Sequence, residues 1–195
     1  AGLMKINNQS INKIVKNLKL FKLPEGRLQF ISRPNFPLVC IDYAHCPESM
    51  KIVLTTLLNL SNKRKGELIC VFGCGGNRDR SKRPKIGSVV SKLASRGYVT
   101  SDNPRSEDVK SINYEIYQGI PNNCKNNWKQ IEDRKLAIYA AVKNSKSSDV
   151  ILVAGKGHES TQWIGKERIP FSDILVIKDI LASDFNKNNF LKNNS

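Results

Sequence analysis

The sequence lacks the features that define several classes of protein. None of its apolar runs approaches the roughly 20 residues that a membrane-spanning helix needs, and its N-terminus lacks the basic and then apolar order of a secretory signal. Five cysteines in 195 residues are too few for a disulfide-rich scaffold. Apolar residues make up 39% of the chain, which is enough for a core. We therefore expect neither a membrane protein nor a disulfide scaffold.

Acidic residues are scarce as well: 17 Asp and Glu stand against 32 Lys and Arg, and the net charge is +15 at pH 7. A strongly basic chain can bind nucleic acid or another polyanion. Here the lysines are scattered, and no aromatic residues interleave with them as a base-stacking surface would require. We interpret most of the charge as a compositional bias and expect no nucleic-acid partner. A basic nucleic-acid-binding module is the alternative from another functional class.

The cysteines show no pattern typical of a metal site. Cys40 and Cys70 lie in apolar runs, where a thiol usually serves as a small apolar side chain. Cys70 and Cys74 are four residues apart, but no second such pair or partnered histidine follows. We expect reduced thiols in a cytoplasmic protein, and no metal bound by this chain.

The chain divides at a stretch rich in proline. Apolar residues at helical spacing predict a helix within residues 1–22, and prolines and a glycine interrupt that pattern in residues 23–37. We expect residues 1–37 to be the tail of a preceding domain and a hinge segment. Residues 38–195 form a second domain in this interpretation, and its Asn- and Lys-rich end after about residue 184 frays.

Short apolar strands alternate with helical patterns from residue 38 onward. Continuous apolar runs predict buried strands at residues 38–41, 68–72, 98–100 and 150–154. Helices are expected after Pro47, after Pro84, and at about residues 107–118, 128–143 and 173–182, with a hairpin turn at Gly165-Lys166. This alternation indicates an α/β fold with a mostly parallel sheet and helices on both faces. Ligands bind at the carboxyl ends of the strands in such folds.

The loop after the second predicted strand has the composition of an anion site. It contains three glycines in residues 73–76, and residues 77–85 contain five cations and one acid. Glycine permits close approach of the backbone to a ligand, and the helix expected after Pro84 adds its N-terminal dipole. The loop is not a Walker A motif, because no Gly-Lys-Ser/Thr closes it. We prefer an anion site to a solvated basic turn.

The loops after the other strands are ambiguous when each is taken alone. Asp42 and His45 suit a ribose and a phosphate, or a simple turn. The run from Asp102 to Arg105 combines an acid, an amide and a guanidinium, which suits a zwitterion as well as it suits a surface turn. The last loop offers Glu159 as a partner for an amine, beside a histidine and a lysine that are equally compatible with structural or solvated roles. Four such loops at one sheet edge form a stronger signal than any one of them.

Four segments together resemble the C-terminal domain of the Mur ligase family. They are Asp42-Tyr43-Ala44-His45-x-Pro47, Val71-Phe72-Gly73-Cys74-Gly75-Gly76-x-Arg78-Asp79, Asp102-Asn103-Pro104-Arg105 and Ala154-Gly155-Lys156-Gly157-His158-Glu159. Their order and spacing match the family over about residues 25–182, most closely its diaminopimelate-adding members. Cys46 and Asn77 depart from the family, which usually has Thr and often Asp there, but neither is assigned to a site.

The resemblance implies a Rossmann-like domain and an activity for the whole enzyme. It implies an ATP-dependent amide ligase of peptidoglycan synthesis, which joins meso-2,6-diaminopimelate to UDP-MurNAc-L-Ala-D-Glu through an acyl phosphate. In the family a central domain with a P-loop binds most of the ATP and Mg²⁺, and no such P-loop occurs here. We therefore expect a monomeric fragment that is inactive alone and carries no catalytic residue.

The same resemblance assigns roles to individual residues. Arg78 would bind a carboxylate of the amino acid, and Gly155 and Glu159 would bind its distal ammonium. The distal amino-acid centre would be held by Asp102, Asn103 and Arg105, with Pro104 fixing the turn. The nucleotide would be reached by Arg27, Asp42 and His45 when the domains close.

The Asp-Asn-Pro-Arg sequence favours meso-diaminopimelate over lysine, because in the family it goes with diaminopimelate. Diaminopimelate has a second carboxylate that lysine lacks, and a buried Arg105 without that partner would be an unpaired charge. A lysine-adding ligase stays the alternative within the family. A degenerate, non-catalytic binding domain is a third possibility, and the intact Arg78, Arg105 and Glu159 argue against it.

Overall fold

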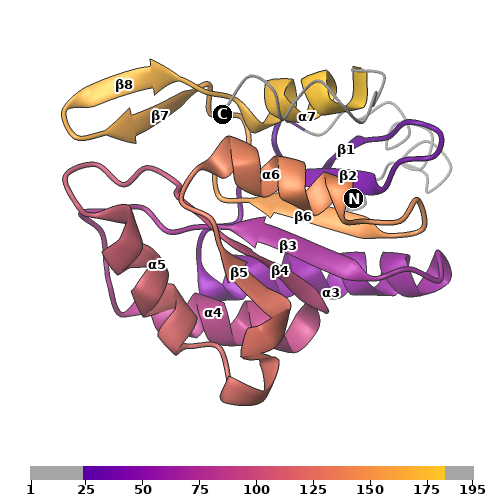
Figure 1. Cartoon of the computed structure of the whole chain (residues 1–195), viewed down its shortest axis with the longest axis horizontal. Helices are drawn as coiled ribbons and strands as arrows, with labels where there is room; N and C mark the ends of the chain where they lie inside the picture. Colours follow the sequence, from indigo (N-terminus) through magenta and orange to yellow (C-terminus); the bar gives the residue numbers. More distant parts are fainter. Residues whose placement is uncertain (1–23, 183–195) are drawn as a thin grey trace, which may run out of the picture.

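A six-stranded sheet runs through the middle of the computed structural model, which describes residues 24–182 (Figure 1). The strand order is β1-β2-β6-β3-β4-β5, and only β1 is antiparallel to its neighbour. The strands are β1 (Gln29–Ile31), β2 (Leu38–Asp42), β3 (Leu68–Phe72), β4 (Arg96–Val99), β5 (Trp128–Gln130) and β6 (Val150–Ala154). A separate hairpin consists of β7 (Thr161–Ile164) and β8 (Glu167–Pro170).

Helices cover both faces of the sheet (Figure 1). One face carries α3 (Pro47–Lys63), α4 (Lys82–Leu93) and α5 (Val109–Gln118), and the other carries α6 (Arg134–Lys143) and α7 (Asp173–Ala182). A 3₁₀ helix, η1 (Asn122–Asn127), leads into β5. The predicted α/β fold with a mostly parallel sheet is therefore confirmed.

The central strands are apolar throughout because each of their faces packs against a helical layer. Every residue of β3 and β6 is buried. Alternate residues point to opposite faces, so Cys70 and Leu152 pack with α3 to α5, whereas Val71 and Val153 pack with α6 and α7. Cys40 and Cys70 are thus core side chains, and all five cysteines are free thiols.

Two local predictions differ from the structure. Residues 128–143 are not one helix: Trp128–Gln130 is the edge strand β5, and the helix begins at Arg134 after Asp133, whose side chain accepts a hydrogen bond from the Leu136 amide. The short strand β1 was not predicted and lies within the expected hinge, where three residues are too few to reveal a period.

The remaining elements agree with the sequence patterns to within a few residues. The helix expected after Pro84 begins at Lys82, so Pro84 lies in its first turn, where proline is tolerated. The predicted hairpin turns at Gly165, whose φ is +59°. The helix expected within residues 1–22 and the tail after residue 184 lie outside the described residues. None of the helices in residues 24–182 is long and apolar enough to cross a bilayer.

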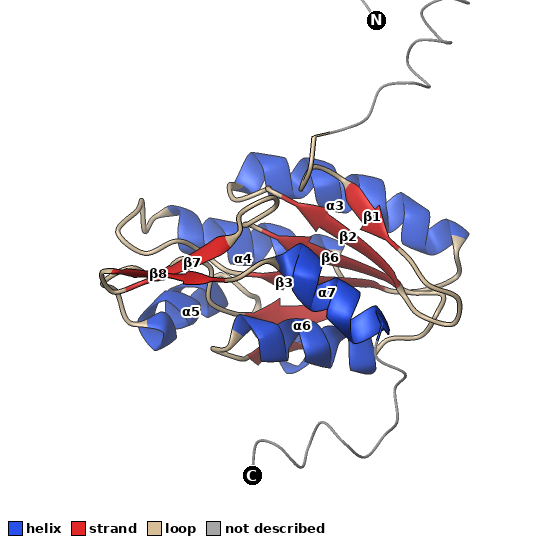
Figure 2. Ribbon diagram, turned by 90° about the horizontal axis from the view of Figure 1, so that it is seen from above, coloured by secondary structure: helices blue, strands red, loops and turns tan. Residues whose placement is uncertain are grey.

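The fold brings the four singled-out loops to one edge. β2, β3, β4 and β6 are mutually parallel, so their carboxyl ends point the same way. The hairpin β7–β8 stands at this end of the domain in both views (Figures 1 and 2). Ligands of parallel α/β folds bind at this edge of the sheet.

Candidate functional site

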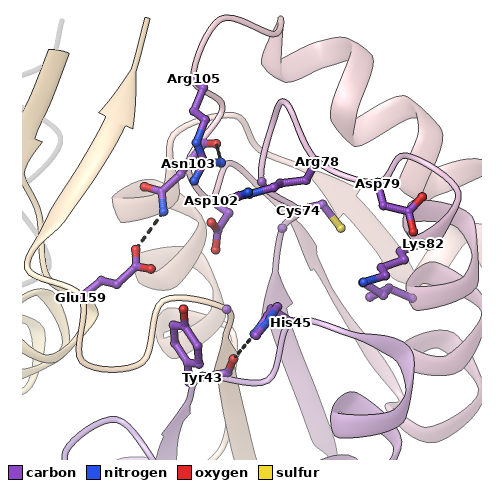
Figure 3. Close-up of a pocket in the computed structure, with 14 residues that line it drawn as sticks. Tyr43, His45, Cys74, Arg78, Asp79, Lys82, Asp102, Asn103, Arg105 and Glu159 are labelled. Carbon is purple, nitrogen blue, oxygen red and sulfur yellow. Dashed lines mark hydrogen bonds between the residues drawn. The ribbon is translucent and has the colours of Figure 1, made fainter. Parts of the chain in front are cut away.

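A cavity of about 390 Å³ opens at the carboxyl ends of the strands (Figure 3). Most of its lining is polar or charged. The lining residues are Tyr43, His45, Gly73, Cys74, Gly75, Arg78, Asp79, Lys82, Ile86, Asp102, Asn103, Arg105, Gly155 and Glu159. All four predicted loops contribute to it, which confirms that the fold brings them together.

The glycine-rich loop after β3 packs against the backbone of the loop after β4 and also lines the cavity. A Cβ at Gly73 would lie 2.1 Å from the Thr100 carbonyl oxygen, and one at Gly76 would lie 1.8 Å from that of Pro104. These two glycines therefore permit contact between two loop backbones. Gly73 also lines the cavity beside Gly75, whose added Cβ would lie 3.1 Å from Arg105 Nη1. The expectation that all three glycines serve a ligand needs this correction.

A buried arginine, Arg83, holds this loop in place. Its side chain is 1% exposed, and its Nη1 lies 2.9 Å from Glu107 Oε2 and 2.8 Å from Glu115 Oε2. Its Nη2 also donates to the Gly75 carbonyl at 3.4 Å. The hydrogen bond from Arg83 lowers the pKa of Glu107. One of the five cations assigned to an anion site is thus a structural group, a role that its position in a basic run did not reveal.

Arg105 reaches the cavity from an unusual backbone conformation. Its φ of +54° lies in the left-handed region, which non-glycine residues seldom occupy. Its Nη1 donates to the Gly76 carbonyl at 2.8 Å and to the Asn103 carbonyl at 3.3 Å. The other guanidinium N–H groups form no hydrogen bond within residues 24–182. Pro104 is buried in this turn and does not line the cavity.

Asp102 provides a carboxylate at the centre of the same cavity. Burial raises its pKa, although the positive charges of Arg134 and Lys156 oppose the rise. A Cβ at Gly155 would lie 2.5 Å from Asp102 Oδ2, and the φ of Gly155 is +111°. The backbone conformation therefore favours glycine at position 155, and an added Cβ would displace the Asp102 carboxylate. An incoming ammonium would compensate the desolvated carboxylate of Asp102.

Lys156, Asn103 and Glu159 form a hydrogen-bonded network that holds a second carboxylate, that of Glu159, at the cavity. Lys156 Nζ donates to Glu159 Oε2 at 2.8 Å and to Asn103 Oδ1 at 3.0 Å, and Asn103 Nδ2 donates to Glu159 Oε2 at 2.8 Å. Burial opposes ionisation of Glu159, but these hydrogen bonds outweigh it and lower its pKa. Oε1 of Glu159 takes no part in the network. Lys156 is fully buried, so a solvated role for it is wrong.

A buried ion pair supports the strand ends from beneath. Arg134 and Asp173 are both fully buried and joined by two hydrogen bonds of 2.8 Å. The Arg134 guanidinium also donates to the carbonyls of Ser101 at 3.3 Å and Ala154 at 2.9 Å, immediately before Asp102 and Gly155. The pair thus fixes two of the cavity loops. No local sequence pattern could reveal it, because the partners are 39 residues apart.

The residues predicted to reach a nucleotide do not form one cluster. His45 lines the cavity and its Nδ1 is 2.8 Å from the Tyr43 carbonyl oxygen. Arg27 Cζ lies 4.8 Å from the centroid of the Tyr43 ring. Asp42 is 8% exposed and accepts hydrogen bonds from the amides of Leu28 at 2.9 Å and Ala44 at 2.8 Å. In this structure Asp42 therefore ties the segment before β1 to the end of β2.

The described residues offer no complete metal site. Residues 24–182 contain no group of three His, Cys, Asp or Glu side chains that could hold a metal ion. Cys74 lines the cavity, but burial raises the pKa of its thiol to about 12, so it stays protonated at neutral pH.

The charges around the cavity match an amino acid with an additional carboxylate. Figure 3 shows Arg78, Asp102, Arg105 and Glu159 around the same hollow. Two guanidinium groups suit two carboxylates, and the carboxylates of Asp102 and Glu159 suit an ammonium. The cavity is therefore equipped to bind and orient a zwitterion, whereas residues 24–182 present no nucleophile activated for covalent chemistry.

Known proteins share both this sequence and this fold. A family described as "Mur ligase, glutamate ligase domain" matches residues 26–157. The chain belongs to the Mur ligase family. The first three sequence segments, and residues 154–157 of the fourth, lie within the matched residues, in agreement with the resemblance.

Several relatives of this Mur ligase chain carry the same name, UDP-N-acetylmuramoyl-L-alanyl-D-glutamate--2,6-diaminopimelate ligase. The enzyme of Rickettsia bellii is 43% identical over 165 residues, which are 85% of this chain and 33% of the relative. That of Buchnera aphidicola is 42% identical over 183 residues, 94% of this chain and 34% of the relative. The chain thus spans about a third of the length of these relatives.

Solved structures agree with this assignment. A structure of an enzyme with the same name superposes with a TM-score of 0.72 at 33% identity, over 91% of this chain and 35% of the other. UDP-N-acetylmuramate-alanine ligase from Thermotoga maritima superposes with a TM-score of 0.62 at 15% identity, over 92% of this chain and 34% of the other. The second likeness shows the shared fold alone.

Proposed function

We propose that this chain is the amino-acid-binding domain of an ATP-dependent ligase that adds meso-2,6-diaminopimelate to UDP-MurNAc-L-Ala-D-Glu in peptidoglycan synthesis. The observation that carries the proposal is the pairing, in one cavity, of Arg105 and Arg78 with Asp102 and Glu159. Relatives at about 40% identity are named for the same reaction. We further propose that residues 1–37 are the end of the preceding ATPase domain and the hinge, within which β1 joins the sheet of this domain, and that the enzyme works as a cytoplasmic monomer.

The proposed contribution of this chain is to hold the incoming amino acid. Arg105 binds the distal carboxylate, and the distal ammonium lies between Asp102 and Glu159, near the backbone of Gly155. Arg78 binds the other carboxylate. This leaves the second amine free to attack the acyl phosphate of the D-glutamate side chain, with loss of phosphate and a proton. Orienting that amine removes rotational freedom from the reaction and contributes several kcal/mol.

ATP and Mg²⁺ belong mainly to the part of the enzyme that precedes this chain in our proposal. Residues 24–182 contain no group of three or more His, Cys, Asp or Glu side chains that could hold a metal ion. His45 lines the cavity, Arg27 contacts the Tyr43 ring, and Asp42 accepts a hydrogen bond from the Leu28 amide. We propose that Arg27, Asp42 and His45 meet the nucleotide when the domains close.

The proposal is tested by titrating the 195-residue chain with meso-diaminopimelate and with L-lysine, observed by NMR. We expect saturable binding of meso-diaminopimelate and at least tenfold weaker binding of L-lysine, since a hydrogen bond to a charged group contributes about 1.5–3 kcal/mol. Arg105→Ala should abolish this preference. Equal binding of the two amino acids, or no binding by the folded chain, would contradict the proposed function.

A further inference from the structure

The hairpin β7–β8 is bonded residue by residue to the loop that carries Arg105. Gln162 Nε2 donates to Ser101 Oγ and to the Asp102 carbonyl, both at 2.8 Å. The Trp163 amide donates to Asn103 Oδ1 at 2.9 Å, and the Trp163 carbonyl accepts from the Arg105 amide at 2.9 Å. The hairpin comes some 60 residues later in the chain, and its hydrogen bonds hold this loop in its conformation.

The indole of Trp163 contacts the guanidinium that faces the cavity. Arg105 Cζ lies 5.0 Å from the ring centroid, and Arg168 Cζ, from β8, lies 4.7 Å from it. Indole is the aromatic ring that attracts guanidinium most strongly, and stacking on an aromatic face suits the planar group. Arg105 lines the cavity, whereas Trp163 does not.

Two kinds of contact hold the Arg105 guanidinium in one orientation. Among the guanidinium nitrogens of Arg105, only Nη1 forms hydrogen bonds within the described part of the chain, and it forms two. These two hydrogen bonds hold one edge of the guanidinium, and the ring of Trp163 contacts the group as well. Trp163 Nε1 is buried and has no hydrogen-bond partner within residues 24–182. The face of the ring, rather than its N–H, therefore makes the contact that matters.

We propose that Trp163 is a positioning residue that sets the specificity of the site, by holding the Arg105 guanidinium ready for the second carboxylate of the amino acid. The identity of that ligand rests on the proposed function. The positioning itself rests on the contact between Trp163 and Arg105. Trp163 acts through Arg105 and touches no substrate.

The test compares three variants of the 195-residue chain. Trp163→Leu removes the aromatic face but keeps the backbone hydrogen bonds to Asn103 and Arg105. Trp163→Phe keeps a face and removes only an N–H without a partner. Ile169→Ala changes an exposed residue of the same hairpin, 37% accessible, and serves as the matched control. Thermal unfolding of each variant checks that the fold is retained.

The first readout needs no ligand. The Arg105 Nε–Hε NMR signal, identified through its loss in Arg105→Lys, should be sharp and displaced by the ring current in the parent chain. We expect it to move and broaden in Trp163→Leu, and to stay sharp in Trp163→Phe and Ile169→Ala. An Arg105 signal that is the same in Trp163→Leu as in the parent would overturn the proposal, whatever the ligand.

The second readout is the ratio of the affinities for meso-diaminopimelate and L-lysine. Trp163→Leu should weaken meso-diaminopimelate binding about tenfold and leave L-lysine binding within about twofold, with rescue by Trp163→Phe. An unchanged ratio in Trp163→Leu, in a parent chain that discriminates, would overturn the specificity role alone. A parent chain that binds neither amino acid would overturn the proposed function, and the Arg105 signal would still decide the positioning role.

Discussion

Two buried arginines, Arg134 and Arg83, support different loops of the cavity in different ways. Arg134 and its partner Asp173 are both fully buried, and the guanidinium also caps two strand-end carbonyls. Arg83 is equally buried, but its partners Glu107 and Glu115 are 24% and 23% exposed. The first arginine is part of the core, whereas the second anchors a surface loop.

The difference predicts how each side responds when its arginine is lost. A carboxylate left alone in the core has no access to water and keeps its full desolvation penalty. Partly exposed carboxylates regain water when their partner is removed. Loss of Arg134 should therefore destabilise the whole domain, whereas loss of Arg83 should mainly increase the mobility of the glycine-rich loop.

Arg134→Met should produce the largest effect. It leaves Asp173 buried without its partner, and we expect a loss of about 3–5 kcal/mol in the free energy of unfolding, measured by urea denaturation. A double variant, Arg134→Met with Asp173→Leu, should recover much of that loss because the buried charge is gone. A loss below about 1 kcal/mol in the single variant would contradict this account of the ion pair.

Arg83→Met should have a smaller effect, about 1–3 kcal/mol in the same measurement. Amide hydrogen exchange should accelerate mainly in the glycine-rich loop of residues 73–77, and slow exchange should persist in β3 and β6. A loss of unfolding free energy as large as that of Arg134→Met, or faster amide exchange throughout the sheet, would contradict the proposed difference between the two arginines.

Acidification should reduce the stability that Arg83 provides, because it protonates the partners of Arg83, Glu107 and Glu115. The hydrogen bond from Arg83 lowers the pKa of Glu107 below its ordinary 4.5, and hydrogen bonds from Arg80 and then Arg83 lower that of Glu115. A lowered folded-state pKa stabilises the fold above the unfolded value, and that contribution is lost as the pH falls below 4.5. Asp102 works in the opposite direction, because burial raises its pKa and its protonation on acidification favours the fold.

The expected result is a loss of stability between about pH 6 and pH 3 that is smaller in Arg83→Met than in the parent chain. Urea denaturation at both pH values measures it. Equal losses in the two proteins would show that the two glutamates do not act through Arg83.

The sequence predicted the sheet and the loop edge because both depend on local signals. The runs that became β3 and β6 are apolar at every position and are followed directly by glycine, and β2 is apolar up to its last residue, Asp42. The placement of Arg78, Asp102, Arg105 and Glu159 around one cavity follows from that topology. Their roles toward a ligand remain proposals.

The supports of the site could not be predicted, because they join distant parts of the chain. Arg134 sits in a stretch that looked like the middle of a longer helix, and its function depends on Asp173 in α7. Trp163 and Gln162 lie in a short hairpin whose partners are 60 residues earlier. The sequence was compatible with a solvated Lys156, whereas the structure buries this side chain and hydrogen-bonds it to Glu159.

The most direct test of the account is a crystal structure of the chain with meso-diaminopimelate. We predict one carboxylate on the Arg105 guanidinium, the distal ammonium between Asp102 and Glu159, and the second amine directed out of the cavity. A ligand bound elsewhere, or bound with its second carboxylate away from Arg105, would contradict the claim that this cavity selects an amino acid by its additional carboxylate.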